Sequence, residues 1–279
     1  MKHFSALRKD KIDSLAIGVF DGVHLGHRQL LKKLSSNGAV LIIYKEKANI
    51  TPGHTRSDYI NYPCFYIKFS KIKELGCDEF ISFLMSEYPN LRKIIVGYDF
   101  KFGANRSCDV FDLKKIFPGK IEVVDEFFLD GVSVHSSTIR KYIENGDIEM
   151  ANRLLGRNYC IKGGVISGQG LGKKELVPTI NLDTGKYLLP KNGVYATKSL
   201  IDGKLYNSIT FIGTRESTDK KFSFETHIIG KNISEVKEMK VCFFKFIREN
   251  RKFSSLESLK DQIKKDIATS LEYLATTSG

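Results

Sequence analysis

The chain has 279 residues, of which 42% are hydrophobic and 27% charged, and this length suits one large globular domain or two of ordinary size. Its formal net charge is +12, which favours anionic partners such as nucleotides, nucleic acids or anionic membranes without choosing among them. No apolar run approaches the roughly 18 residues of a membrane span, and the charged N-terminus lacks the apolar stretch of a signal peptide. We therefore expect a cytoplasmic protein with no membrane partner.

The five cysteines are dispersed along the chain, at Cys64, Cys77, Cys108, Cys160 and Cys242. Their number is odd and no two of them form a C-x-x-C pair, which argues against a disulfide framework and against a zinc site. A scattered set of this kind is typical of a reducing compartment.

The first half of the chain alternates apolar runs with helical patterns, and residues 45–58 between them are polar. Helices are predicted at residues 28–36 and 78–88. Strands are predicted at residues 15–20, 39–44, 93–98 and 121–127. Because strands alternate with helices, we expect a mostly parallel sheet with helices on its faces.

Two short helices are predicted after this region. Ser136 or Ser137 can cap the first helix, and Gly146 can end it. Asp147 can cap the second helix, which ends by Gly156. The domain boundary is placed there, so that residues 1–156 form one domain and residues 157–279 the other.

The second half of the chain is rich in predicted strands, at residues 159–167, 194–201, 204–212, 222–229 and 241–247. Asp202 and Gly203 separate two of them and are typical of a type I′ hairpin turn. These short strands predict a small antiparallel barrel. A terminal helix follows, with Ser254 and Glu257 as a capping box, and we expect it to pack on the barrel through an apolar stripe of Leu256, Leu259, Ile263, Ile267 and Leu271.

The segment from Gly18 to His27 reads GVFDGVHLGH and lies between a predicted strand and a predicted helix. Ligands of open parallel sheets bind beyond the carboxyl ends of the strands, and a helix N-terminus there attracts phosphate. Gly22 and Gly26 allow close approach of the backbone, while His24 and His27 can point at one phosphate and stabilise its charge. A turn with two surface histidines is the alternative.

This segment resembles the H-x-G-H motif of nucleotidylyltransferases, and over its whole length it resembles the bacterial bifunctional riboflavin kinase/FAD synthetase (FMN adenylyltransferase) family. Three further segments agree with that family, at residues 96–103, 136–140 and 146–157. The resemblance implies a Rossmann-like nucleotidylyltransferase domain with a parallel sheet. Its reaction would be ATP-dependent adenylylation of FMN to FAD with release of pyrophosphate.

The resemblance also implies roles for individual residues of the first domain. His24 and His27 would be catalytic, and Asp99 and Phe100 would line the flavin pocket. ATP would be bound by Gly18, Phe20, Asp21, Gly22, Gly26, Ser137, Thr138 and Arg140. Two alternatives stay open: the serines and threonine are also a good helix start, and Asp99 is also a common turn residue.

A second chemical site is predicted in the second half. The glycine-rich loop at residues 168–174, with Gly172 and Lys173, can cradle ATP phosphates through its backbone. Thr179 and Asn181 are two residues apart and share one face of a strand, and such a pair of oxygen ligands suits Mg²⁺. An exposed hairpin with a polar face is the alternative.

This region resembles the riboflavin kinase module of the same family, an antiparallel β-barrel with a terminal helix. Thr179 and Asn181 match its P-T-x-N motif for the magnesium nucleotide. Glu225 lies in a segment similar to the strand that carries the family's catalytic glutamate, and it would accept the proton of the riboflavin 5′-hydroxyl. The implied reaction is phosphorylation of riboflavin to FMN, with Mg²⁺ as cofactor and ATP as co-substrate.

The chain departs from the family pattern in three places. Residues 175–177 read ELV where the family has L-G-F, residues 211–217 lack an Asn and a Pro-Thr pair, and Cys108 replaces a glycine. One alternative is therefore a monofunctional FAD synthetase with a degenerate kinase barrel. Another is a basic nucleic-acid-binding protein, although no motif of that class is present. The expected substrates are riboflavin, FMN and ATP, with no nucleic acid and no obligate protein partner.

Overall fold

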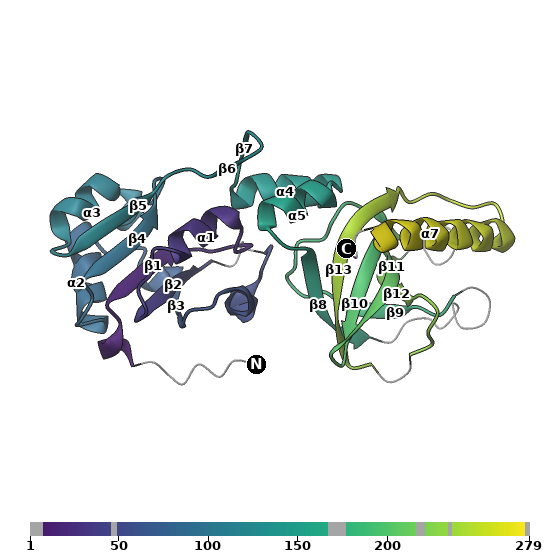
Figure 1. The fold of residues 1–279 in the computed structure, drawn as a ribbon, viewed down its shortest axis with the longest axis horizontal. Coiled ribbons are helices and arrows are strands. Elements are labelled where there is room, and N and C mark those ends of the chain that lie inside the picture. The colour runs from purple at the N-terminus through teal and green to yellow at the C-terminus, as the bar shows by residue number, and fades with distance from the viewer. Residues whose placement is uncertain (1–7, 46–48, 167–176, 216–220, 234–235, 277–279) are drawn as a thin grey trace. The chain divides into compact units, whose positions relative to one another are not determined.

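The computed structural model describes residues 8–45, 49–166, 177–215, 221–233 and 236–276. The chain divides into two compact units, Met1–Ser136 and Ser137–Gly279, which Figure 1 shows in purple to teal and in teal to yellow. The boundary predicted at residues 156–157 follows the change in strand pattern instead and stays a prediction. Among the residues in these ranges, no helix is long and apolar enough to cross a membrane.

The first unit is built on a five-stranded parallel sheet in the order β3-β2-β1-β4-β5, as predicted. The strands are β1 (Ser14–Gly18), β2 (Gly38–Tyr44), β3 (Cys64–Lys68), β4 (Lys93–Gly97) and β5 (Lys120–Val124). Successive β1 side chains belong to different core clusters, Leu15 and Ile17 to one and Ala16 to the other, because side chains alternate along a strand. The sheet is therefore buried on both faces.

Helices cover each face of this sheet. Helices α2 (Cys77–Glu87) and α3 (Val110–Ile116) supply residues to one core cluster, and α1 (Leu25–Leu31) supplies residues to the other. Short 3₁₀ turns link the elements: η1 (Lys9–Lys11), η2 (Gly53–Tyr59), η3 (Phe69–Lys71) and η4 (Ala104–Arg106). The sequence analysis missed β3, whose residues are half-buried, and α3, which begins at the N-cap Asp109.

The connection to the second unit contains a small hairpin and two helices. The hairpin pairs β6 (Phe128–Leu129) with β7 (Val132–Ser133). The helices are α4 (Ser136–Asn145) and α5 (Ile148–Leu155). Three of the predicted helix signals are confirmed: Gly146 has φ +82° after α4, Asp147 caps α5 by accepting from the Met150 amide at 3.1 Å, and Gly156 ends it at φ +65°. The predicted caps Ser136 and Ser137 instead lie within α4.

The second unit contains a closed barrel of six antiparallel strands in the order β10-β11-β12-β9-β8-β13. The strands are β8 (Tyr159–Ile166), β9 (Ile180–Asp183), β10 (Gly193–Ile201), β11 (Lys204–Thr214), β12 (Phe222–Ile228) and β13 (Glu238–Arg248). Asp202 and Gly203 form the predicted turn, with φ +46° and +77°. The sequence analysis missed the four-residue β9.

Small hydroxyl side chains line part of the buried face of the barrel strands. Thr197 lies 2.8 Å from Ser208 and 2.9 Å from Thr210, which in turn lies 3.0 Å from Thr226. All four residues are fully buried. Because each hydroxyl finds a partner, the polar interior avoids the cost of unsatisfied groups.

The terminal helix α7 (Leu256–Thr276) packs against β10, β11 and β13, as expected. Two details of the prediction are wrong. The reciprocal caps join Ser255 and Ser258 rather than Ser254 and Glu257. The ends of the apolar stripe, Leu256 and Leu271, are exposed, and the buried residues are Asp266, Ser270 and Leu274. Asp266 can be buried because Arg248 donates three hydrogen bonds to it, at 2.7–3.0 Å. A hydrophobic pattern does not reveal this partner.

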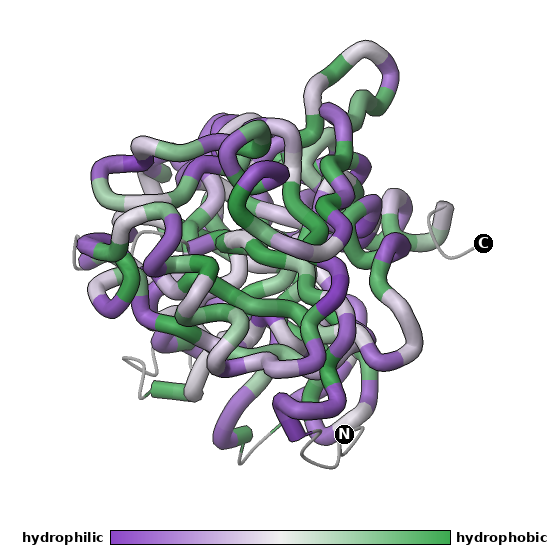
Figure 2. Tube along the Cα trace, turned by 90° about the vertical axis from the view of Figure 1, so that its left-hand side faces the viewer, coloured by the Kyte–Doolittle hydropathy of each residue, from purple (hydrophilic) through white to green (hydrophobic). Residues whose placement is uncertain are grey.

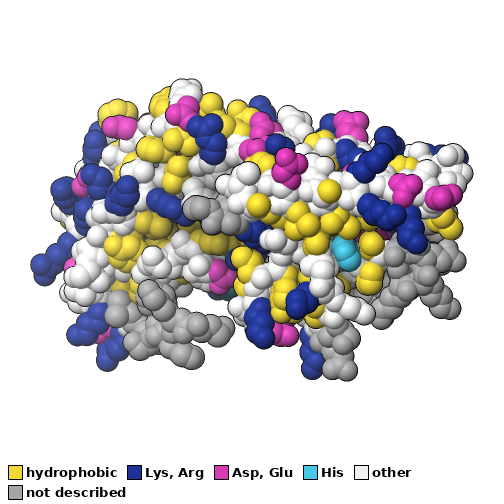
Figure 3. All heavy atoms as spheres, turned by 45° about the vertical axis from the view of Figure 1, so that its right-hand side comes forward, with side chains coloured by type: hydrophobic (Ala, Val, Ile, Leu, Met, Phe, Trp, Pro, Cys, Tyr) yellow, Lys and Arg dark blue, Asp and Glu magenta, His cyan; other side chains and the backbone are white. Residues whose placement is uncertain are grey.

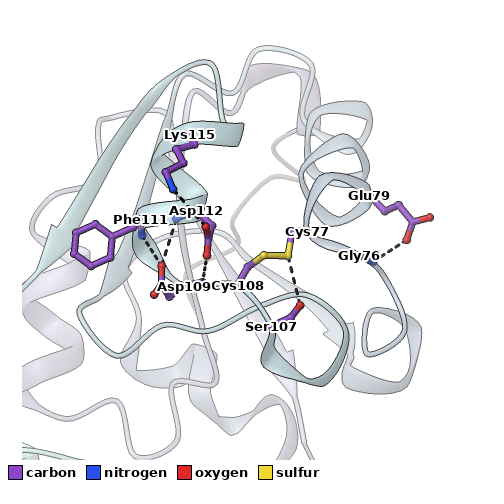
Figure 4. The surroundings of a disulfide bond; sticks show 9 residues. All are labelled: Gly76, Cys77, Glu79, Ser107, Cys108, Asp109, Phe111, Asp112 and Lys115. Atoms are coloured by element: carbon purple, nitrogen blue, oxygen red, sulfur yellow. Dashed lines mark hydrogen bonds and ion pairs between the residues drawn. A yellow bond between two sulfur atoms is a disulfide. The ribbon is translucent and has the colours of Figure 1, made fainter.

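The expectation of unpaired cysteines is wrong for four of the five. Cys77 at the start of α2 forms a disulfide with Cys108, which precedes α3 (Figure 4). Cys160 and Cys242 are register partners on β8 and β13 and form the other disulfide. The partners are 31 and 82 residues apart in the sequence, so the topology brings them together. Cys64 stays a free thiol, and burial raises its pKa to about 12.

Hydropathy follows this architecture. Figure 2 looks from the side of the first unit and shows hydrophobic stretches running through the interior, with hydrophilic residues gathered at loops and ends. The predicted combination of a parallel sheet with helices and an antiparallel barrel with a terminal helix is confirmed.

Candidate active sites

The first site is the turn that joins β1 to α1. Phe20 and Val23 have φ of +53° and +42°, and Gly22 has φ +84°. Non-glycine residues with positive φ have a strained backbone. Such strain persists where the surrounding structure imposes it, often at functional sites. Both Phe20 and Val23 are fully buried, so packing holds the turn in this shape. The backbone of the predicted phosphate-binding segment is therefore preformed.

The two histidines of this turn are brought together. His24 is the N-cap of α1, and its Nδ1 accepts from the His27 amide at 3.3 Å. Their rings stack with centroids 3.6 Å apart. Because Nδ1 of His24 accepts a hydrogen bond, the neutral ring carries its proton on Nε2. The ring is thereby prepared to donate from Nε2.

Asp21, predicted to bind ATP, lies inside the molecule at 3% exposure. Its carboxylate accepts from the Thr51 amide at 3.0 Å, and Thr51 Oγ1 accepts from the Gly22 amide at 2.8 Å. Fully buried Arg56 donates to the Thr51 carbonyl at 3.0 Å, and burial lowers its pKa although the charge of Asp21 opposes this. Thr51 therefore holds the turn through hydrogen bonds, and Arg56 holds Thr51. Nothing in the polar sequence around these two residues indicated this role.

A strap at residues 132–136 closes over the same turn. Ser136 Oγ donates to the Asp21 carbonyl at 2.8 Å. A Cβ on Gly26 would lie 3.0 Å from the Val134 carbonyl oxygen, so a side chain there would push the strap away. Glycine at position 26 therefore lets the strap lie close to the turn without a shift of a few tenths of an ångström.

His135 of this strap points to the ends of β4 and β5. Its Nε2 lies 3.1 Å from both the Tyr98 hydroxyl and a Glu126 carboxylate oxygen. Hydrogen bonds from Ser133 and His135 lower the pKa of Glu126, and burial and nearby carboxylates raise the pKa of Tyr98. Sequence reasoning missed this cluster.

Asp99 and Phe100, the predicted flavin residues, follow β4 directly. Asp99 is exposed, whereas the Phe100 ring packs partly against the core and stacks on Phe102. The predicted triphosphate residues Ser137, Thr138 and Arg140 lie in the first turns of α4. Ser137 is exposed, and it follows the strap residue Ser136 in sequence.

The second site gathers around Glu225 on β12. Glu225 Oε1 accepts from Ser223 Oγ at 2.7 Å and from Arg215 Nη1 at 2.9 Å. Glu225 Oε2 lies 3.3 Å from Thr179 Oγ1. On the same strand Phe224 and Thr226 are buried while Glu225 is half-buried, because side chains alternate along a strand. The structure therefore brings the predicted base and a predicted metal ligand together.

Asn181 joins the same cluster, because its Oδ1 lies 3.0 Å from Ser223 Oγ. Two neighbouring side-chain oxygens, on Thr179 and Asn181, fit the oxygen ligands that Mg²⁺ prefers. Alternation along the strand predicts Ser223 on the same face as Glu225, whereas no local pattern indicated Arg215, which sequence reasoning missed. Gly172 and Lys173 lie outside the described residues.

An open hollow of about 630 Å³ lies at the start of β12, where Phe222 lines it. Its lining includes Phe222, Asn192 and Asn250. Phe222 is 55% exposed and begins the strand that carries Glu225. The hollow therefore offers an aromatic surface three residues from the predicted base.

Comparison with protein families matches residues 155–274 to riboflavin kinase and residues 7–49 to FAD synthetase. The chain is 33% identical to the bifunctional riboflavin kinase/FMN adenylyltransferase of Buchnera aphidicola subsp. Schizaphis graminum over 93% of both chains. It is 29% identical to the Bacillus subtilis protein of that name, over 94% of this chain and 92% of the other. A crystal structure of a Streptococcus pneumoniae protein named macrolide-efflux protein superposes with a TM-score of 0.82 at 25% identity, covering 93% of this chain and 94% of that one.

The two family matches cover the two candidate sites described above. The FAD synthetase match contains the histidine turn, and the riboflavin kinase match contains Glu225, Thr179 and Asn181. The name macrolide-efflux protein belongs to the Streptococcus pneumoniae protein and differs from the names of the two relatives above. With 33% identity along 93% of both sequences, the chain belongs to the bifunctional riboflavin kinase/FMN adenylyltransferase family.

Proposed function

We propose that this chain phosphorylates riboflavin to FMN at the barrel and adenylylates FMN to FAD at the parallel-sheet domain, using ATP in both reactions. The observation that carries the proposal is the presence of two separate polar constellations, each within a segment matched to one activity. One is the stacked pair His24 and His27, and the other is the cluster around Glu225. The barrel domain is taken as residues 157–279.

In the adenylylation reaction, an FMN phosphate oxygen attacks the α-phosphorus of ATP and pyrophosphate leaves. Both reactants are already charged, so the residues must mainly position two anions and neutralise them. His24 and His27 donate to the phosphate at which charge develops, and Gly18, Phe20, Gly22 and Gly26 shape the backbone around it. Asp21 acts by fixing the turn through Thr51.

Other groups hold the two substrates of this reaction. Ser137, Thr138 and Arg140 bind the ATP triphosphate, for which hydroxyl, amide and guanidinium donors are suited. Asp99 and Phe100 line the flavin side. In both reactions Mg²⁺ would supply positive charge that neutralises the phosphates.

In the kinase reaction, Glu225 accepts the proton of the riboflavin 5′-hydroxyl as that oxygen attacks the γ-phosphorus. Thr179 and Asn181 would hold Mg²⁺, and their contacts with Glu225 and Ser223 place these oxygens beside the base. Phosphoryl transfer depends chiefly on such positioning and neutralisation.

The hollow beside Phe222 receives the isoalloxazine ring in this proposal. A strand advances about 3.3 Å per residue, so Phe222 and Glu225 are separated by roughly 10 Å along β12. An aromatic side chain that is 55% exposed supplies a stacking surface for the ring.

The test is incubation of the purified chain with riboflavin, ATP and Mg²⁺, with the flavins separated by chromatography over time. FMN should appear first and FAD later. FAD formed from supplied FMN, without FMN formed from riboflavin, would select the monofunctional alternative. Folded protein that makes neither nucleotide would refute the proposal.

The nucleic-acid alternative rests on the net charge alone. On the face shown in Figure 3, Lys and Arg side chains are interspersed with acidic and apolar ones and do not gather in one stripe. A nucleic-acid-binding surface usually concentrates its cations. We therefore expect only weak binding to RNA and DNA, of the non-specific electrostatic kind that disappears as the salt concentration is raised.

A further inference from the structure

Arg215 is the one described partner of Glu225 that carries a positive charge, since the others are the hydroxyls of Ser223 and Thr179. The side chains of Arg215 and Glu225 are 19% and 17% exposed. Arg215 follows the end of β11, and its amide donates to the Lys221 carbonyl at 3.0 Å. The backbone of Arg215 is therefore fixed next to Lys221, and its guanidinium reaches the carboxylate of the predicted base.

The geometry of this ion pair differs from that of the structural pair in the same unit. Arg248 donates hydrogen bonds to Asp266 from two nitrogens, Nε and Nη2, and Asp266 is 3% exposed. The contact from Arg215 to Glu225 is made by Nη1 at 2.9 Å, to an oxygen that Ser223 also contacts. A guanidinium has five N–H donors in a planar fork, so an arginine can contact a carboxylate and a phosphate at the same time.

The charges of the reacting groups indicate that this second anion is the transferred phosphoryl group. A carboxylate base beside the transferred phosphoryl group adds negative charge where charge is already concentrated. Phosphoryl transfer requires that this charge be neutralised, and an arginine at the transferred group is an effective way to do so. Arg215 is a permanent cation that already touches the base.

We propose that Arg215 is a catalytic residue of the kinase site that contacts the γ-phosphoryl group of ATP while it stays paired with Glu225. This rests on the proposed role of Glu225 as the base. In the step, the riboflavin 5′-oxygen forms a bond to the γ-phosphorus and the bond from that phosphorus to the β,γ-bridging oxygen breaks. The hydroxyl proton goes to Glu225, the electron pair of the broken bond stays on ADP, and Arg215 neutralises the phosphoryl oxygens throughout.

A double-mutant cycle tests the proposal, with Arg215→Met, Glu225→Gln and the combination. Loss of a preorganised cation or donor commonly lowers kcat by about 10²–10³, so Arg215→Met should lower riboflavin phosphorylation by that factor and Arg215→Lys by less. Unchanged FMN adenylylation by the same preparations shows that each variant is folded. The matched control is Lys162→Met, which removes a cation from an exposed pair with Glu238 in the same barrel and should leave both activities unchanged.

The combined variant separates the two ways in which Arg215 could act. If Arg215 contacts the phosphoryl group, its loss lowers the rate further in the Glu225→Gln background. If the combined variant is as active as Glu225→Gln alone, Arg215 acts only by holding Glu225 and the proposal is overturned. A Glu225→Gln variant with wild-type kinase activity refutes the base instead, so the two failures are distinguishable.

Inhibition of riboflavin phosphorylation provides a second readout. The β,γ-methylene analogue of ATP carries a γ-phosphonate and ADP does not. Arg215→Met should raise the inhibition constant of the analogue by about tenfold or more and leave that of ADP nearly unchanged, since roughly 1.4 kcal/mol of differential contact corresponds to tenfold. Equal weakening of both inhibitors would overturn the proposal.

Discussion

Replacement of His24 by asparagine should separate the structural role of this residue from its chemical role. His24 caps α1 through Nδ1, which accepts from the His27 amide at 3.3 Å. At that length the bond is weak, so its loss in His24→Ala should cost about 0.5–1 kcal/mol of unfolding free energy. Asparagine is among the best N-caps, and its oxygen can accept the same bond. His24→Asn should therefore unfold at nearly the wild-type temperature.

The chemical role should be lost in both variants. Asparagine cannot present a donor where Nε2 lies, and removal of one preorganised donor costs about 10²–10³ in rate. We expect kcat for FAD formation from FMN to fall by that factor in His24→Asn, and likewise in His27→Ala. The assay is chromatography of FMN and FAD at saturating ATP, with thermal melts of each variant.

Riboflavin phosphorylation by the same preparations is the internal control and should stay within about twofold of wild type, because additivity holds for independent sites. Wild-type FAD formation by His24→Asn would mean that the ring donates nothing to the reaction. Equal loss of both activities would show that the two sites are not separable.

Three further outcomes are expected. Cys77→Ser opens a disulfide spanning 31 residues, so it should lower the unfolding free energy by about 3–4 kcal/mol; a denaturant melt matching that of untreated wild type would contradict this. Glu126 has a folded-state pKa below its ordinary 4.5, so its ionised form stabilises the protein above that pH and the contribution is lost as pH falls through the folded pKa. Glu126→Gln should therefore flatten the fall in melting temperature on acidification, and an unchanged acid profile would count against the cluster. A fragment of residues 157–279 should melt cooperatively and bind magnesium ADP, and a non-cooperative melt would move the domain boundary.

Local sequence determined the fold class and much of the first site. The continuous apolar run of β1, the strand–helix alternation and the switch to short strands predicted the two architectures, because the apolar pattern of an element reports which of its faces are buried. Single residues fixed several details, such as the type I′ turn at Asp202 and Gly203 and the end of α5 at Gly156. His24 and His27 are three residues apart, so one helical turn was enough to bring them together.

Tertiary structure decided everything that depends on contacts between distant segments. Thr51 and Arg56 reach the turn across about thirty residues, Arg215 and Thr179 meet Glu225 only when the barrel closes, and the disulfides depend on strand register and loop approach. The buried Asp266 of α7 escaped prediction for the same reason, since its partner Arg248 lies on β13. A propensity or a periodicity describes a residue and its near neighbours, whereas the free energy of a buried polar group is set by the partner that the fold places beside it.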